Sequence, residues 1–146
     1  MRPGELEQYI RTHIPLSKSM AVAVVSVAPE QVVLEAPLAP NINHRATVFG
    51  GSAAALAILA GWSLLHVRLA AEGVAARLVI QRNTMEYLQP IAGPFTARAS
   101  LERPERWQHF TTMLARKHKA RVGVRAVLEH AGQVVGRFGG EFVALA

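Results

Sequence analysis

The sequence predicts an α+β fold in which a curled antiparallel sheet wraps one long central helix. Three observations lead to this prediction. A stretch from Gly50 to Val67 is apolar nearly all round, which is typical of a helix covered on most sides. Segments rich in β-branched residues precede and follow it, with short turn sequences between them. The 146 residues contain no repeat, linker or low-complexity tract, so we expect one domain over residues 1–146.

The segment before the central helix predicts a short helix and a hairpin. Apolar residues recur at helical spacing over residues 5–13, and Pro15 follows the expected end of that helix. Residues 21–27 and 31–36 are rich in Val and flank a turn that contains Pro29, which predicts two paired strands. Two prolines and two asparagines then predict a loop over residues 37–45.

The segment from the central helix onward predicts one helix followed mainly by strands. We expect the helix over residues 51–71, ending near Gly73. Gly139 and Gly140 inside the last strand suggest a bulge or a close backbone approach. The expected strands cover residues 77–88, 95–101, 120–130 and 133–145, with a helical excursion over 104–117 and a hairpin turn at Ala131 and Gly132.

The composition excludes several classes of protein. The absence of cysteine removes disulfides, thiolate metal sites and a Cys nucleophile, and it fits a reducing compartment such as the cytoplasm. The six histidines show no metal-ligand spacing, so we expect no metal. The first 20 residues mix acids and bases without an apolar core, which argues against a signal peptide. The stretch from Gly50 is slightly short for a membrane span and holds polar residues, which favours a buried helix.

The chain is basic, with a formal net charge of +6. This charge fits nucleic acid, an anionic membrane surface or an acidic small partner. No RNA-binding motif with interleaved aromatics and no helix-turn-helix signature is visible, which argues against nucleic acid. A charge run is more often a solvated face than a binding site. The densest run comprises Arg116, Lys117, His118, Lys119 and Arg121.

The segment from Asn43 to Ser52 is a polar loop that runs into two glycines at the expected helix start. The first turn of a helix has unpaired N–H groups and a partial positive charge. Glycine lets a ligand come close to those amides, so such a site can hold an anion or a developing oxyanion. The alternative, a glycine cap packed against a neighbouring strand, remains open on these grounds.

This loop resembles the active-site loop of hot-dog-fold acyl thioesterases, in which Asn, five residues, His or Phe and Gly-Gly open the central helix. Asn43, Phe49, Gly50 and Gly51 match the pattern. The stretches HIPLSKSM, APLAPNINHRATVFGG and LAILAGWSLLH are similar to one subfamily, found alone or fused behind a GNAT acetyltransferase. The resemblance implies a single hot-dog domain that forms a homodimer. Characterised members of that subfamily are malonyl-acyl carrier protein decarboxylases.

One position departs from the related thioesterases, which carry an Asp or Glu seven residues after the second glycine. Ile58 stands there, and the helix contains no acid from Ser52 to His66. A hydrolase needs a base or nucleophile, whereas decarboxylation of a malonyl thioester needs an enolate stabilised in a poorly solvated pocket. A carboxylate there would repel the substrate carboxylate, so Ile58 favours decarboxylation.

The resemblance implies roles for residues around the loop. We expect the Asn43 side-chain amide and the Gly51 N–H to be the oxyanion donors, with Gly50 and Phe49 beside the substrate. His44 could orient the substrate or protonate the enolate, although a loop histidine bonded to backbone is the simpler alternative. Three further candidates are Thr47 in the loop, Thr84 as a polar contact from its strand, and Glu86 as a substitute acid.

The basic residues have an expected role through the same resemblance. Arg116, Lys117 and Lys119 would meet an acidic acyl carrier protein or the phosphates of coenzyme A, and Arg45 the phosphate of phosphopantetheine. No cofactor is expected beyond phosphopantetheine on the substrate. The first hypothesis is therefore conversion of malonyl-ACP to acetyl-ACP, which primes fatty-acid synthesis. The alternatives are an acyl-CoA or acyl-ACP thioesterase and an acyl-thioester-binding module without catalysis.

Overall fold

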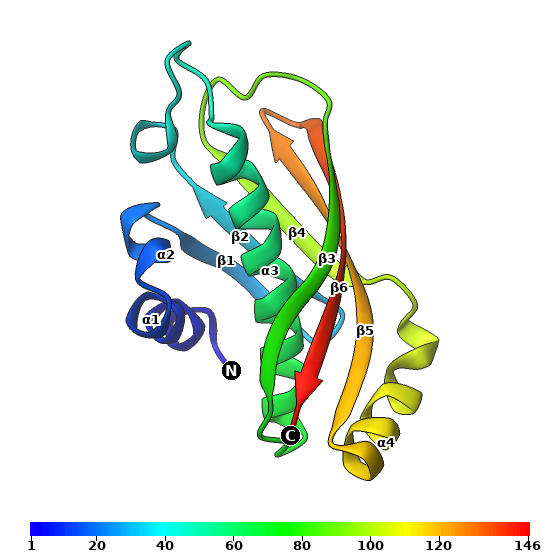
Figure 1. Cartoon of the computed structure of the whole chain (residues 1–146). Coiled ribbons are helices and arrows are strands. Elements are labelled where there is room, and N and C mark those ends of the chain that lie inside the picture. Colours follow the sequence, from blue (N-terminus) through cyan, green and yellow to red (C-terminus); the bar gives the residue numbers. More distant parts are fainter.

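The computed structural model describes all residues from 1 to 146, and a six-stranded antiparallel sheet curls around one long helix (Figure 1). The strand order in the sheet is β1-β2-β4-β5-β6-β3. The predicted α+β fold class is confirmed. The elements are α1 (Pro3–His13), α2 (Pro15–Ser19), β1 (Ala23–Ala28), β2 (Gln31–Ala36), α3 (Gly50–Ala71), β3 (Arg77–Tyr87), β4 (Phe95–Leu101), α4 (Trp107–Lys117), β5 (Lys119–His130) and β6 (Gln133–Leu145), with 3₁₀ turns at Ala39–Asn41 and Pro104–Arg106.

Helix α3 forms the centre of the hydrophobic core. By length and composition alone it could cross a membrane, but it packs against β2 to β6 of its own chain, as the core helix of a folded domain does. Gly61 lets α3 lie close to the sheet. A Cβ on Gly61 would lie 3.1 Å from Val124 Cγ1 and 3.2 Å from Phe142 Cε1, so the missing side chain lets the helix settle into the curled sheet.

The hairpin between β5 and β6 forms as expected, and of the two alternatives expected at Gly139 and Gly140, a bulge or a close approach, the structure shows the close approach. Ala131 and Gly132 both have positive φ, 50° and 75°, which is the geometry of a two-residue type I′ turn. The register shift between these strands falls at Leu128 and Glu129, not at the two glycines. Gly140 instead permits a close approach, because a Cβ there would lie 2.6 Å from the Phe138 ring.

The N-terminal segment differs from expectation after the first helix. Pro15 does not merely follow α1: it occupies the first turn of α2, where a missing N–H costs nothing. Ala21, with φ of 57°, then turns the chain, so β1 begins two residues later than predicted. Helix α1 buries Leu6 and Ile10 completely. It therefore belongs to the core and closes one side of the sheet around α3.

A ladder of four rings joins α1 to α3. The Tyr9 ring lies between His13 and His66, with centroid distances of 4.1 and 4.5 Å, and His66 in turn stacks on Trp62 at 4.8 Å. Burial, together with the nearby His13, lowers the pKa of His66 from its ordinary value. The neutral imidazole is therefore the form that the ladder favours.

Acidification should weaken the folded state through His66. A lowered folded-state pKa means that the unfolded chain binds the proton first, so stability is lost as pH falls below about 6.5. We expect the urea midpoint to fall between pH 7.5 and pH 5.5, and to fall by less in His66→Phe. His130→Gln serves as the control because His130 lies outside the ladder, where its Nδ1 donates to the Pro94 carbonyl at 2.7 Å. An equal fall in His66→Phe and wild type would contradict this prediction.

Helix α4 lies outside the sheet at the far end of α3. Its first residue, Trp107, donates from Nε1 to Glu72 Oε2 at 2.6 Å, and the Arg68 guanidinium lies 4.3 Å from the Trp107 ring centre. The helix ends at Lys117, where His118 adopts left-handed geometry with φ of 59°. The chain turns there directly into β5. The predicted helical excursion is thus confirmed.

Candidate active site

The start of α3 presents two unpaired backbone donors. The first bonds of the helix run from Ser52 N–H and Ala53 N–H to the Phe49 carbonyl, at 2.9 and 3.1 Å. The N–H groups of Gly50 and Gly51 have no hydrogen-bond acceptor, and Gly51 is exposed. They lie at the positive end of a 22-residue helix. Both amides are available to an anionic or carbonyl oxygen.

Asn43 and Thr47 close the loop that leads to this helix start. The Asn43 N–H donates to the Thr47 carbonyl at 2.8 Å, and the Thr47 N–H donates to Asn43 Oδ1 at 3.1 Å. Asn43 Nδ2 donates to Thr47 Oγ1 at 2.9 Å, and Arg45 N–H donates to Asn43 Oδ1 at 2.8 Å. The Asn43 side chain thus replaces backbone partners in a tight turn.

The Asn43 amide is more fully engaged than expected for an oxyanion donor. One of its two hydrogens goes to Thr47 Oγ1, and the other makes a long contact of 3.4 Å with the Val48 carbonyl. Only the second hydrogen is weakly held and can turn toward a ligand. The Gly51 N–H is therefore the freer donor, and Asn43 first holds the loop in shape.

The loop is anchored to the body of the protein by a residue that the sequence did not single out. Asn41 is 2% exposed, and its Nδ2 donates to the Met20 and Pro37 carbonyls at 2.9 and 2.8 Å. Its own carbonyl accepts the Phe49 N–H at 2.8 Å. From the sequence alone, Asn41 indicates only a loop. Its burial depends on a contact with the end of α2, which is 21 residues away in the chain. It fixes the chain one residue before the helix.

Two exposed aromatic rings flank the glycines. Phe49 is 58% exposed, and a Cβ on Gly51 would collide with its ring. On the other side, the Tyr87 hydroxyl donates to the Gly50 carbonyl at 3.3 Å. A Cβ on Gly50 would lie 3.4 Å from the Tyr87 ring. Glycine at both positions keeps the rings close to the helix start and the amides open.

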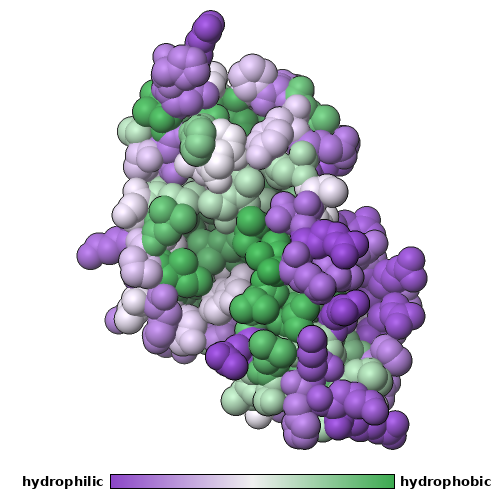
Figure 2. All heavy atoms as spheres, in the orientation of Figure 1, coloured by the Kyte–Doolittle hydropathy of each residue, from purple (hydrophilic) through white to green (hydrophobic).

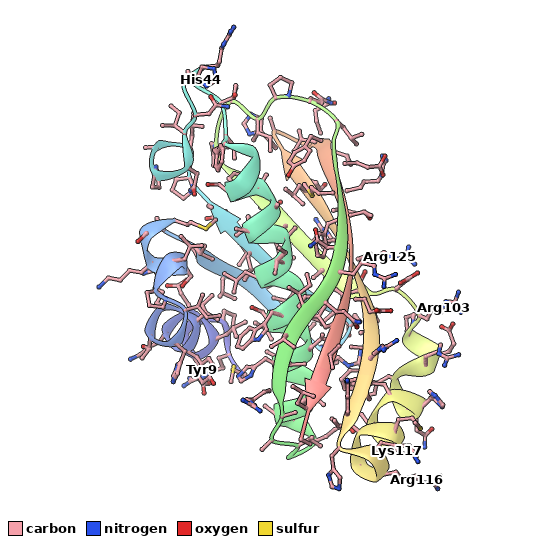
Figure 3. All side chains as sticks on the ribbon, viewed as in Figure 1. Tyr9, His44, Arg103, Arg116, Lys117 and Arg125 are labelled. Carbon is pink, nitrogen blue, oxygen red and sulfur yellow. The ribbon has the colours of Figure 1, made fainter.

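His44 and Arg45 lie at the outer tip of the loop. Both side chains are exposed, and their only mutual contact is a long one of 3.4 Å from Arg45 Nε to His44 Nε2. Figure 3 shows His44 extending outward from the loop. Within one protomer these two residues can meet a ligand that approaches the loop from outside, but they do not line the helix start.

Thr84 and Glu86 do not join the site within one protomer. In β3, Thr84 pairs with Gly139 and Glu86 with Arg137, on the sheet face that points away from α3. Tyr87, with the opposite orientation, is the residue of this strand that reaches the helix start. Within one protomer this geometry does not bring Thr84, the expected polar contact, or Glu86, the expected substitute acid, to the helix start, so both roles stay predictions.

Ile58 lies on the same face of α3 as Gly51, about two turns or ~10 Å further along. It is half-buried and packs against the core. All ten acidic residues of the chain are glutamates, and none occurs between Glu35 and Glu72. Neither the loop nor α3 itself therefore supplies a carboxylate beside the free amides.

The cluster of Arg116, Lys117 and Lys119 lies far from this loop. These residues occupy the end of α4 and the first residue of β5, at the opposite end of α3 (Figure 3). The predicted basic cluster and the predicted oxyanion site are thus two separate places on one protomer.

Comparison with known proteins identifies the family to which this architecture belongs. The family model described as "Putative thioesterase (yiiD_Cterm)" matches residues 4–146. The chain belongs to this family, whose fold is the hot-dog fold. A solved protein of unknown function from Chlorobaculum tepidum is 28% identical over 99% of this chain and 96% of its own, with a TM-score of 0.90. A solved protein from Shewanella oneidensis, described as a "putative thioesterase", is 26% identical over 99% of this chain and 97% of its own, with a TM-score of 0.84.

A more distant neighbour supports the fold alone. A thioesterase from Haemophilus influenzae superposes with a TM-score of 0.80 at 12% identity, covering 99% of this chain and 91% of its own. Together the comparisons support an enzyme of the thioesterase kind. They therefore favour the thioesterase alternative over malonyl-ACP decarboxylation, for which they give no evidence.

Proposed function

We propose that this protein is an enzyme that acts on acyl groups held as thioesters, at the start of α3. The observation that carries this proposal is the pair of unpaired N–H groups at Gly50 and Gly51, beside the loop closed by Asn43. A thioester carbonyl oxygen placed there would gain charge during reaction. One preorganised donor of this kind contributes about 2.7–4 kcal/mol to the transition state.

Hydrolysis is the reaction that the family comparison favours. Water attacks the carbonyl carbon, the carbonyl oxygen becomes an oxyanion on the Gly51 N–H, and collapse of the tetrahedral intermediate expels the thiol. The positive end of α3 stabilises that oxyanion. The attacking water needs a base, and the loop and α3 of the same protomer offer no carboxylate for it.

Decarboxylation of a malonyl thioester is the second candidate, and Ile58 favours it. Loss of CO₂ leaves the electron pair of the broken C–C bond on the thioester as an enolate, whose oxygen would rest on the same amides. No base is required to start this step. An apolar side chain at position 58 disfavours hydration of the substrate carboxylate, and proton uptake at carbon then yields the acetyl thioester. On either reading the acyl group arrives on phosphopantetheine, from acyl carrier protein or coenzyme A in the cytoplasm.

We also propose that the active form is a homodimer joined through β3. This strand is 11 residues long, contains no proline and forms one open edge of the sheet. Long open edges normally have a partner. Val79 on β3 is 50% exposed, and Figure 2 shows apolar side chains gathered on the face over α3 and β3. A second copy pairing antiparallel along β3 would cover this edge.

Light scattering coupled to size-exclusion chromatography should give a mass close to twice 15.8 kDa at micromolar protein. Replacing Val79 by Lys should shift the population toward monomer, because charge on an edge strand opposes edge-to-edge pairing. Val25→Lys is the matched control, since Val25 is 49% exposed on β1 at the opposite edge of the sheet. A monomer in wild type, or equal effects of the two substitutions, would contradict pairing through β3.

Ile58→Glu should strengthen hydrolysis at the expense of decarboxylation. A carboxylate on the Gly51 face of α3 can serve as base for water and repels the malonyl carboxylate. We expect thiol release from acetyl-CoA to rise by an order of magnitude or more over wild type, measured with a thiol reagent. Ile58→Gln is the control, because glutamine has the shape of glutamate without its charge. If neither variant changes thiol release, position 58 does not face the reacting thioester.

The proposed function is tested by incubating the purified protein with acetyl-, longer acyl- and malonyl-CoA and measuring free thiol and CO₂ separately. Thiol release supports hydrolysis, and CO₂ without thiol supports decarboxylation. Tight binding of the thioesters with neither product would overturn the enzyme proposal and leave a binding module.

A further inference from the structure

Tyr87 makes the one side-chain hydrogen bond to the two glycines at the start of α3. Its hydroxyl donates to the Gly50 carbonyl at 3.3 Å, across 37 residues of the chain. That carbonyl belongs to the same peptide unit as the Gly51 N–H, the freer donor of the candidate site. A peptide unit is planar, and its C=O and N–H point in opposite directions. The hydroxyl therefore holds the far side of the group that would meet the substrate oxygen.

The sheet fixes the position of Tyr87. It is the last residue of β3, which ends beside the start of α3 (Figure 1), and it pairs with Gly136 of β6. The next residue also bonds to β6, through its N–H to the Val135 carbonyl at 2.9 Å. The Tyr87 ring lies against Gly50, because a Cβ on that glycine would be 3.4 Å from Tyr87 Cε1. The hydroxyl is thus presented by a paired strand end, independently of the loop that Asn43 closes.

The peptide between Gly50 and Gly51 needs such a hold. Glycine on both sides gives this unit more freedom to rotate than any other pair of residues would. The Gly51 N–H has no acceptor, so nothing fixes the donor side of the peptide. On the other side, the carbonyl of the first helical residue receives the N–H four residues on, which leaves a second lone pair. The Tyr87 hydroxyl bonds to that carbonyl as well.

We propose that Tyr87 is a positioning residue of the active site, whose hydroxyl fixes and polarises the Gly50–Gly51 peptide so that the Gly51 N–H becomes a stronger and preset oxyanion donor. This inference rests on the proposed thioester function and adds a residue to it. Hydrogen bonds that follow one another in a chain strengthen each other. A donor on the Gly50 carbonyl therefore increases the positive partial charge on the Gly51 N–H. Tyr87 acts through this peptide and does not itself touch the reacting atoms.

The length of this bond places its main effect in the transition state. At 3.3 Å it is longer than the roughly 2.5–3.0 Å usual for O–H···O bonds. Catalytic hydrogen bonds are often long without substrate and tighten in the reacting complex. As negative charge builds on a substrate oxygen bound to the Gly51 N–H, the Gly50 carbonyl becomes a better acceptor for Tyr87. The hydroxyl therefore raises kcat more than substrate affinity.

Steady-state kinetics of Tyr87→Phe test this role, because phenylalanine keeps the ring against Gly50 and removes only the hydroxyl. We expect kcat to fall about three- to tenfold, with KM near the wild-type value. Tyr9→Phe is the matched control, since Tyr9 is the only other tyrosine and stacks on His66 in the ring ladder. It should keep the wild-type kcat. An unchanged kcat in Tyr87→Phe, or a change in KM alone, would overturn the proposal.

Amide NMR spectroscopy tests the hold on the peptide without substrate. Tyr87→Phe should move the Gly51 amide nitrogen resonance upfield, because the peptide is less polarised when its carbonyl loses a donor. The ring remains in Tyr87→Phe, so ring-current shifts stay nearly the same, and Tyr9→Phe should leave Gly51 unchanged. An unmoved Gly51 resonance in Tyr87→Phe would overturn the proposal even if kcat falls. A wild-type protein that turns over no thioester would instead overturn the proposed function, which the resonance shift does not test.

Discussion

Asn43→Ala should lower the turnover of thioester substrates by about 10²–10³-fold, the loss typical of removing one oxyanion-hole group. The substitution removes the Oδ1 acceptor of the Thr47 and Arg45 N–H groups and the Nδ2 donor to Thr47 Oγ1. The loop before α3 then loses its fixed shape. It also removes the side-chain hydrogen that only the long Val48 contact engages. The measurement is kcat/KM on the best substrate, with circular dichroism to confirm the fold.

Thr47→Val is the matched control for this loop. It removes only Oγ1, the acceptor of one Asn43 bond. The bond from the Asn43 N–H to the Thr47 carbonyl and the bond from the Thr47 N–H to Asn43 Oδ1 both remain. We expect a loss of about tenfold or less, consistent with one neutral hydrogen bond of ~1 kcal/mol. Asn43→Ala that stays folded and retains full activity would remove Asn43 from the site. Equal losses in both variants would mean that loop shape alone explains its role.

Phe142→Ala should cost about 3–5 kcal/mol in the free energy of unfolding. Phe142 is 1% exposed, and its ring fills the space that Gly61 leaves between α3 and β6. Truncation opens a cavity at a close contact between the central helix and the sheet, where Gly61 has no side chain to fill it. Urea unfolding at pH 7.5 with a constant m-value measures the effect.

Phe49→Ala provides the comparison within the same residue type. Phe49 is 58% exposed, so its truncation should change the free energy of unfolding by about 0.5 kcal/mol or less. Its effect should appear in substrate affinity, because the ring lies against Gly51. If Phe142→Ala is as mild as Phe49→Ala, then Gly61 and Phe142 do not form the central helix–sheet contact.

Most of the fold could be predicted because its signals are local. The apolar surface of α3, the Val-rich strands and the Ala131-Gly132 turn each identify an element within a short window. The errors arise where distant contacts decide. Pro15 can either end one helix or begin the next. In the structure it begins α2, whose end is held by the hydrogen bond from Asn41 Nδ2 to the Met20 carbonyl. In the sequence, Gly139 and Gly140 indicate a bulge or a close approach without naming the neighbour. The folded structure shows that the Phe138 ring occupies the space beside Gly140.

The candidate site was predictable where one segment of the chain contains it. The loop and the double glycine adjoin in sequence, so Asn43, Thr47, Gly50 and Gly51 were found together. Tyr87 was missed because it reaches Gly50 from 37 residues away. Thr84 was chosen over it because alternation gives two faces and does not say which one meets α3. The basic cluster at the end of α4 and the start of β5 was predicted from its run in the sequence. Arg103 and Arg106 were missed, because only folding brings them beside Lys119 and Arg121.

The central claim is that the helix start beside Asn43 carries out acyl-thioester chemistry. Intact-mass spectrometry of malonyl-acyl carrier protein after incubation with the protein tests it most directly. We expect the carrier to lose either CO₂ or the whole malonyl group with wild type, and to stay unchanged with Asn43→Ala. A malonyl carrier that persists with wild type, or a mass change of equal rate with Asn43→Ala, would contradict the claim.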